Sequence, residues 1–135
     1  MSWWVALPIL RSIYPQVSDE SKKSQYYSMD LRNIEVLLEE SEQQLDFTED
    51  WLTYYLDLDI VHHHLVCTLC EYYSVNYALS KEIKMCLEYN AQFDREDRKE
   101  IVLTSQNIKI LESAALSRYV LIKQLTDYNV STYMH

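Results

Sequence analysis

The chain has 135 residues, with 12 Lys and Arg against 21 Asp and Glu, which gives a formal net charge of −9. This length suits one domain with a single core, and the acidic charge argues against nucleic acid as a partner because phosphate backbones repel it. The sequence contains no glycine, which excludes the glycine-rich loops that cradle nucleotide phosphates and disfavours tight hairpins.

The N-terminal part is expected to contain a short apolar helix and a polar connector. Residues 2–14 are mostly apolar and predict a helix that Pro8 interrupts or opens and that Pro15 ends. Residues 16–28 are polar and predict a connector. Ser28 or Asp30 then caps a helix over 31–45, because apolar residues recur there at helical spacing.

The acidic residues between positions 35 and 50 predict a solvated helix face, which can also steer a basic helix toward the protein. Asp46 followed by Glu49 is similar to a capping box and predicts a new helix over 47–58.

The remaining sequence predicts three further helical segments. Residues 60–79 carry one charged residue and predict a helix that is apolar on nearly all sides, which neighbouring helices must cover. Ser80 is expected to cap a helix over 81–92, and a last helical region over 97–127 is expected to break near Thr104. We therefore expect a single all-α domain over residues 1–135, a helical bundle wrapped around a central hydrophobic helix.

Compartment and membrane signals point to the cytoplasm. Three cysteines are an odd number, so no disulfide framework is expected and a reducing compartment is favoured. The apolar start has no preceding basic residues and no cleavage site, so no signal peptide is expected. Glu71 and three histidines within 60–79 argue against a membrane span.

The start of the 60–79 segment carries histidines and cysteines, the residue types of metal sites and of some catalytic sites. His63, Cys67 and Cys70 share a helical face, and zinc accepts these ligands. Structural zinc sites, however, usually draw ligands from two separated segments, so no metal or other cofactor is expected and a zinc-dependent protein is the third hypothesis. Because Cys67 and its histidine neighbours lie on one apolar helix beside Glu71, the thiol lacks an electropositive niche, and no enzyme activity is expected.

Two segments carry a resemblance to a known family. Leu37-Leu38-Glu39-Glu40-Ser41-Glu42 fits a death-motif helix, which has Leu, three variable residues, a small residue and an acid. Asp59 and the apolar run after it align with the turn into the central helix, which in the family reads Asp-Gly-x-Asn-Trp-Gly-Arg. The stretch 37–72 thus resembles the Bcl family of apoptosis regulators, in a compact form similar to members that large DNA viruses encode.

The resemblance implies an inhibitor of apoptosis that sequesters the death-motif helix of a pro-apoptotic host protein in a hydrophobic surface groove. It also implies a cytoplasmic protein that partners recruit to mitochondria. His62 or His64 would replace the family's arginine, which pairs with an aspartate of the bound helix. The implied groove residues are Leu37, Leu38, Leu45, Leu52, Tyr55, Leu56, His62, His64, Leu65, Thr68 and Tyr72. The alternative is a homodimeric structural or adaptor bundle without a peptide groove, which the apolar N-terminus with Trp3 and Trp4 favours.

Overall fold

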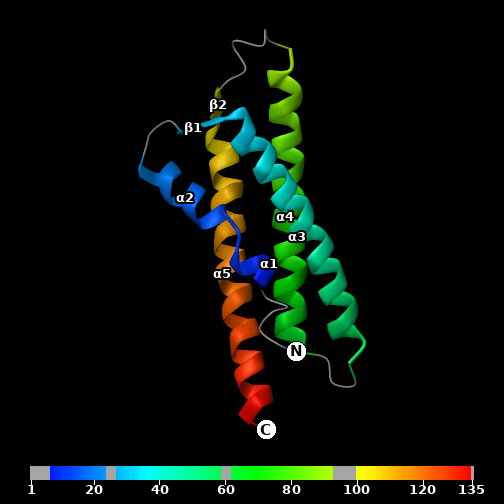
Figure 1. The fold of residues 1–135 in the computed structure, drawn as a ribbon. Helices are drawn as coiled ribbons and strands as arrows, with labels where there is room; N and C mark the ends of the chain where they lie inside the picture. Colours follow the sequence, from blue (N-terminus) through cyan, green and yellow to red (C-terminus); the bar gives the residue numbers. More distant parts are fainter. Residues whose placement is uncertain (1–6, 24–26, 59–61, 93–99, 135) are drawn as a thin grey trace.

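The computed structural model describes residues 7–23, 27–58, 62–92 and 100–134, and it confirms the all-α class. Three long helices form the body of the molecule, and two short helices and two short strands complete it (Figure 1). The elements are α1 (Leu7–Leu10), α2 (Tyr14–Lys23), β1 (Tyr27–Asp30), α3 (Leu31–Leu56), α4 (His63–Asn90), β2 (Glu100–Leu103) and α5 (Ser105–Met134).

The long helices pack along most of their length. α4 contacts both α3 and α5, while α2 packs on α5 and α1 contacts α3 and α5 (Figure 1). Along each long helix, buried residues recur mostly three or four residues apart, a spacing typical of helices that cross at a shallow angle. On α3 these positions are Ile34, Leu37, Ser41, Gln44, Thr48, Trp51 and Tyr55. On α5 they include Asn107, Leu111, Ala114, Arg118, Leu121 and Leu125.

Two apolar clusters form the core, and a buried polar layer lies between them along the helices. One cluster includes Leu37, Ile83 and Leu111, and the other includes Trp51, Leu69 and Leu121. The polar layer contains the buried side chains Ser41, Gln44, Asn76, Ser117 and Arg118. Such a layer disfavours shifted helix pairings, because any shift would place these polar groups against apolar side chains.

The polar layer is held by hydrogen bonds and by the charge of Arg118. The Tyr72 hydroxyl donates to Gln44 Oε1 at 2.9 Å, and Asn76 Nδ2 donates to the Tyr72 carbonyl at 2.7 Å. Burial lowers the pKa of the Arg118 guanidinium, while Tyr72, Glu40 and Tyr14 act electrostatically in the opposite direction. Gln44 and Tyr72 thereby join α3 to α4 within the core.

The N-terminal prediction was wrong from Arg11 onward, because α1 ends at Leu10 and a separate helix, α2, begins at Tyr14. Pro15 lies in the first turn of α2, where its fixed φ suits a helix start, so it does not end a helix. The predicted connector 16–28 instead contributes most of α2 and the start of β1. The buried residues of α2 are Tyr14, Val17, Ser18 and Ser21, which have helical spacing. The apolar pattern of the sequence does not reveal this spacing, because two of the four residues are serines.

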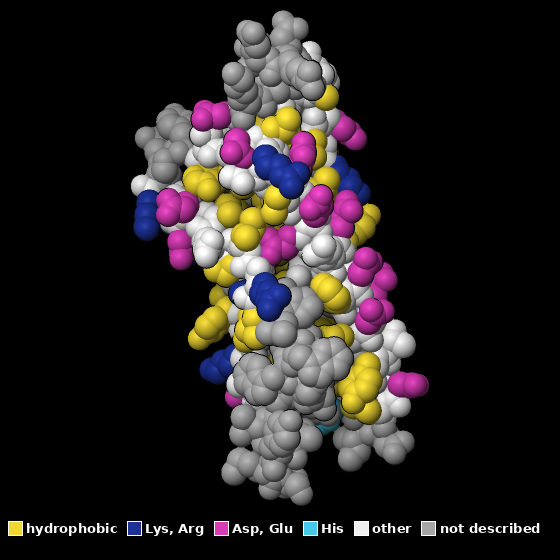
Figure 2. All heavy atoms as spheres, viewed as in Figure 1, with side chains coloured by type: hydrophobic (Ala, Val, Ile, Leu, Met, Phe, Trp, Pro, Cys, Tyr) yellow, Lys and Arg dark blue, Asp and Glu magenta, His cyan; other side chains and the backbone are white. Residues whose placement is uncertain are grey.

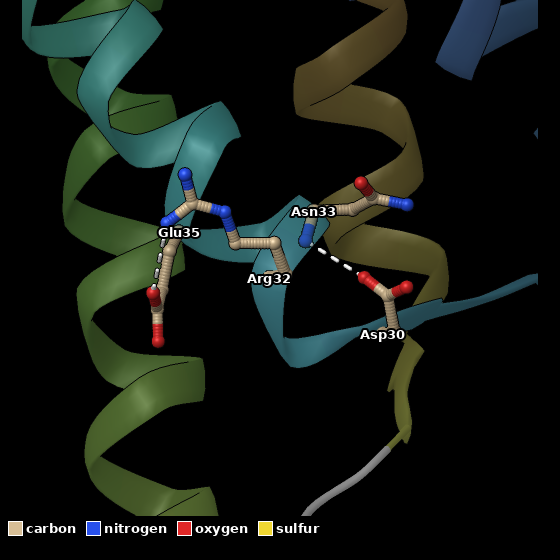
Figure 3. Close-up of polar contacts among 4 residues, drawn as sticks. All are labelled: Asp30, Arg32, Asn33 and Glu35. Atoms are coloured by element: carbon tan, nitrogen blue, oxygen red, sulfur yellow. Dashed lines mark hydrogen bonds and ion pairs between the residues drawn. The ribbon is translucent and has the colours of Figure 1, made fainter.

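The predicted cap of the 31–45 helix is confirmed at Asp30. Its Oδ1 accepts the backbone N–H of Asn33 at 2.8 Å (Figure 3). This contact satisfies one of the amide groups that a helix start leaves without an intrahelical partner. On the next turn, Arg32 and Glu35 form a long ion pair of 4.0 Å at the surface (Figure 3).

Two predicted helix breaks are wrong. Helix α3 runs through residues 46 and 47, because the buried stripe continues through Gln44 and Thr48, and the Thr48 hydroxyl bonds to the Gln44 carbonyl. Helix α4 likewise runs through Ser80, which lies on its buried side. Ser80 therefore looks like a cap in the sequence while it packs inside a helix, whereas Asp46 and Glu49 are exposed residues in the middle of α3.

The prediction that residues 60–79 are covered on all sides is also wrong. One side of α4 is exposed at His63, His64, Cys67, Cys70, Glu71, Ser74 and Tyr77. Among the described elements, two long helices flank α4, and the amphipathic His and Tyr side chains tolerate the water that reaches its third side. In the stretches that the structure describes, none of the helices combines the length and apolar character needed to cross a bilayer.

The last predicted helix is replaced at its start by a strand. β2 pairs antiparallel with β1, with Tyr27 opposite Leu103 and Asp30 opposite Glu100. The two strands are distant in the sequence, so no tight turn joins them, as the lack of glycine requires. The helix begins at Ser105, which confirms the break predicted near Thr104, whereas the predicted start near Asp97 lies outside the described residues.

Glu40 joins α3 to the start of α2, and its pKa gives a pH prediction. Its Oε1 accepts the Ile13 N–H at 2.7 Å, and burial raises the pKa of its carboxyl, opposed by Ile13, Ser12 and Arg118. The folded state therefore binds this proton more tightly than the unfolded state. The proton on Glu40 therefore stabilises the folded state. This contribution is complete at low pH, and it is lost as the pH rises above about 4.3, the pKa of an unperturbed Glu, and through the higher pKa of Glu40 in the folded state.

Relative to Glu40→Gln, the wild-type free energy of unfolding should therefore fall as pH increases through this window. Glutamine keeps an acceptor for the Ile13 N–H but does not titrate. Urea denaturation at several pH values measures the difference, and Glu39→Gln controls for the loss of one exposed charge. Parallel pH profiles for wild type and Glu40→Gln would contradict the assignment.

Candidate functional site

The structure divides the eleven predicted groove residues between the core and the outer surface. Leu37, Tyr55, Leu65 and Tyr72 are at most 4% exposed and belong to the two core clusters. Thr68 is also buried, and its hydroxyl donates to the His64 carbonyl at 2.9 Å. These side chains hold the bundle together in the described conformation and do not face a partner.

The other predicted groove residues are more accessible: Leu38, Leu45, Leu52 and Leu56 lie along one side of α3, whereas His62 and His64 lie at the start of α4. Half-buried side chains are Leu38, Leu45 and Leu52, and exposed ones are Leu56, His62 and His64. Because α3 is one continuous helix, it does not form the two walls that the predicted helices over 31–45 and 47–58 were expected to supply. The predicted turn at Asp59 to Val61 lies outside the described residues.

A large surface hollow lies at the opposite end of α4, where this helix meets β2 and the start of α5. Its volume is about 730 Å³. The lining residues are Glu82, Met85, Cys86, Tyr89, Asn90, Glu100, Ile101, Val102, Thr104 and Asn107. We call this feature the α4–β2 hollow.

Reciprocal capping at the start of α5 shapes one wall of the hollow. Asn107 donates its N–H to Thr104 Oγ1 at 3.1 Å, and the Thr104 N–H donates to Asn107 Oδ1 at 3.0 Å. This arrangement is similar to a capping box, with Asn in place of the usual Glu or Gln. Asn107 Nδ2 also donates to Glu82 Oε2 at 3.1 Å, so the same side chain fixes α5 to α4.

Cys86 lies in the wall of this hollow and is not activated for nucleophilic chemistry. Its Sγ donates to Asn107 Oδ1 at 3.5 Å. Burial and the Glu82 charge raise the pKa of its thiol, although the contact with Asn107 opposes them. A raised pKa keeps the thiol protonated, so Cys86 acts here as a packing residue.

The apolar lining of the hollow remains open to water. Met85 is 54% exposed, Tyr89 64% and Val102 59%. A small-molecule site usually buries most of its ligand within enclosing walls, whereas side chains as open as these suit a larger partner surface. The exposed apolar residues thus favour binding of another polypeptide.

The surface charge is acidic both in the hollow and along α3. Glu82 and Glu100 are the carboxylates that line the hollow, and no Lys or Arg is among its described lining residues. Figure 2 shows acidic side chains along the outer side of α3. The predicted solvated acidic face is wrong for Glu40, which is half-buried and accepts the Ile13 N–H. It is confirmed for the exposed residues Glu35, Glu39, Glu42, Asp46, Glu49 and Asp50.

The sequence did contain a signal for β2 that the helical prediction missed. This signal is the pair of β-branched residues Ile101 and Val102, which favour a strand. The side chains of Glu100-Ile101-Val102-Leu103 are exposed, buried, exposed and buried in turn, but three of the four residues are apolar, so the sequence does not display this alternation.

The cysteine and histidine cluster lies elsewhere on the surface. Cys67 and Cys70 are exposed free thiols, and neither is a core residue. Across the described residues, no three His, Cys, Asp or Glu side chains gather closely enough to hold a metal ion.

Comparisons with known proteins add no relative. No family model, curated protein or solved structure shows significant similarity to the chain. The fold defines the class, an all-α bundle with a small two-stranded sheet, and the geometry of the surface is the basis for a functional proposal.

Proposed function

We propose that the protein is an interaction domain that binds an amphipathic helix of a partner protein in a surface hollow. The observation that carries this proposal is the α4–β2 hollow, whose walls keep large apolar side chains exposed. Exposed apolar surface of this kind marks sites where a partner buries it. Binding of a helix through its apolar side chains is a common mode of peptide recognition.

The resemblance of residues 37–72 to the Bcl family suggests a more specific form of this function, and it does so apart from the α4–β2 hollow, whose described lining residues all lie outside that stretch. In that form the bound helix belongs to a pro-apoptotic host protein, and its sequestration in the cytoplasm or at mitochondria inhibits apoptosis. A helix held through its apolar face is blocked from its own targets. The burial of Leu37, Tyr55, Leu65 and Tyr72 moves the proposed binding surface from the implied groove to the α4–β2 hollow.

A calorimetric binding panel tests the proposed function. The panel contains death-motif peptides from pro-apoptotic proteins and unrelated amphipathic helices with basic polar faces. We expect saturable binding of at least one peptide, because its apolar side chains would cover Met85, Tyr89 and Val102. Matched peptides with Asp at the apolar positions should not bind, and a panel without any saturable binding would contradict the function.

A homodimeric adaptor is the second candidate, and an exposed patch on α5 favours it. Leu116 and Tyr119 are each 65% exposed, and Val120 is 38% exposed. Leu116 and Val120 also border a smaller hollow of about 260 Å³ between α4 and α5. Light scattering during size-exclusion chromatography distinguishes the two: an adaptor would be a dimer with or without peptide. Trp3 and Trp4, which favoured this alternative, lie outside the described residues.

A further inference from the structure

We infer that the α4–β2 hollow selects a basic amphipathic helix, in which Lys or Arg flanks the apolar side chains that enter the hollow. This inference rests on the proposed function and specifies its site and the chemistry of its partner. It follows from the position of the apolar residues and from the sign of the charges beside them.

The apolar anchors lie on two different elements that face the same space. Met85 and Tyr89 are four residues apart, so both project from one face of α4. Val102 contributes an exposed side chain from β2. From Glu82 to Tyr89 the helix rises roughly 10 Å, which is the length of about two turns of a bound helix. Two successive apolar turns of a partner can therefore contact this wall.

All charged side chains among the described residues that line the hollow are acidic. Glu82 lies on α4 and Glu100 on β2, and both line the hollow. The contact from Asn107 to Glu82 Oε2 fixes that carboxylate without neutralising its charge. Asp30 lies opposite Glu100 in the β ladder and adds a further exposed acid nearby.

This charge pattern disfavours an acidic partner helix and favours a basic one. A Lys or Arg beside the apolar anchors would form charge-assisted contacts with Glu82 or Glu100, whereas an acidic side chain would be repelled. The net charge of −9 attracts a basic helix from a distance, but the carboxylates in the lining determine where it docks.

Binding of two designed peptides to site variants tests the inference. The peptides are amphipathic helices of about five turns with the same Leu stripe, and their polar faces carry either Lys or Glu. Met85→Ala/Tyr89→Ala removes the apolar anchors, and Leu116→Ala/Tyr119→Ala is its control, because it removes two equally exposed residues from α5. Glu100→Lys reverses one charge of the hollow, and Asp50→Lys makes the same change in net charge on α3.

We expect the Lys peptide to bind the wild-type protein at least about tenfold more tightly than the Glu peptide. The Met85→Ala/Tyr89→Ala and Glu100→Lys variants should each weaken binding of the Lys peptide by about tenfold, whereas the controls should change it less than about threefold. All four substituted regions are exposed, and Glu100→Lys also removes a like-charge pair with Asp30 across the strands, so these variants should fold.

Each other result overturns a specific part of the inference. If peptides bind but the hollow variants bind like wild type, the site is wrong while the proposed function stands. If the Glu peptide binds equally well, the charge selectivity is wrong. A peptide-free dimer that Met85→Ala/Tyr89→Ala dissociates would identify a second copy of the chain as the occupant. Failure of every peptide here and in the panel would contradict the proposed function itself.

Discussion

The Leu37→Ala variant is expected to lose about 2–5 kcal/mol of unfolding free energy. Leu37 is 1% exposed and packs in the core cluster that α3 shares with α4 and α5. Truncation removes buried apolar surface and leaves a cavity, which the three long helices cannot close without losing their register. Chemical denaturation monitored by circular dichroism measures the loss.

Leu56→Ala is the matched control, because the same substitution is made on the same helix at a side chain that is 56% exposed. It should change the unfolding free energy by less than about 0.5 kcal/mol. The resemblance assigns both leucines to one ligand groove, whereas the structure assigns only Leu37 to the core. If both variants stayed fully stable and both lost peptide binding, the groove would be correct and the core assignment wrong.

The Asn107→Ala variant is expected to lose about 1–3 kcal/mol of unfolding free energy. The side chain is 7% exposed, accepts the Thr104 N–H at the start of α5 and donates to Glu82 on α4. Alanine leaves that amide and the Glu82 carboxylate without these partners. The wall of the α4–β2 hollow should loosen as well, so binding of the Lys peptide should weaken.

Gln106→Ala controls for this substitution, because Gln106 is the exposed neighbour of Asn107 in the same helical turn. It should leave stability and peptide binding close to wild type. Equal stability of the Asn107→Ala and Gln106→Ala variants would show that the reciprocal capping contact is not what fixes α5 to α4.

The sequence predicted the fold class and several helix ends because those features depend on local patterns. Asp30 was named as a cap, the break near Thr104 was placed correctly and the acidic face of α3 was expected. Each depends on residues close together in the chain. Capping chemistry and helical spacing leave such local signals even when the tertiary contacts are unknown.

The errors came from residues whose role depends on distant partners. Asp46, Glu49 and Ser80 were interpreted as residues of new helix starts, but both helices continue through them, because buried residues such as Gln44 and Thr48 extend the packed stripe of α3. β1 and β2 lie about seventy residues apart and stabilise each other only by pairing. No local pattern specifies such a pairing, so the hollow beside β2 could not be located from the sequence.

The same reason explains why the implied groove and the observed hollow differ. The groove prediction transferred positions such as Tyr55 and Tyr72 from a resemblance, and in this bundle both side chains are fully buried. Apolar residues at helical spacing fit a core and a binding groove equally well. Exposure decides between these roles, and it distinguishes Met85 and Tyr89 from Tyr55 and Tyr72.

Mapping the bound Lys peptide by NMR tests the central claim most directly, because amide shifts report on each part of the surface separately. We expect the largest shift changes during the titration at Met85, Tyr89 and Val102, with smaller changes around Leu56 and His64. The proposed site would be contradicted if the largest changes lay around Leu52, Leu56 and His64 while the amide signals of Met85 and Val102 did not shift.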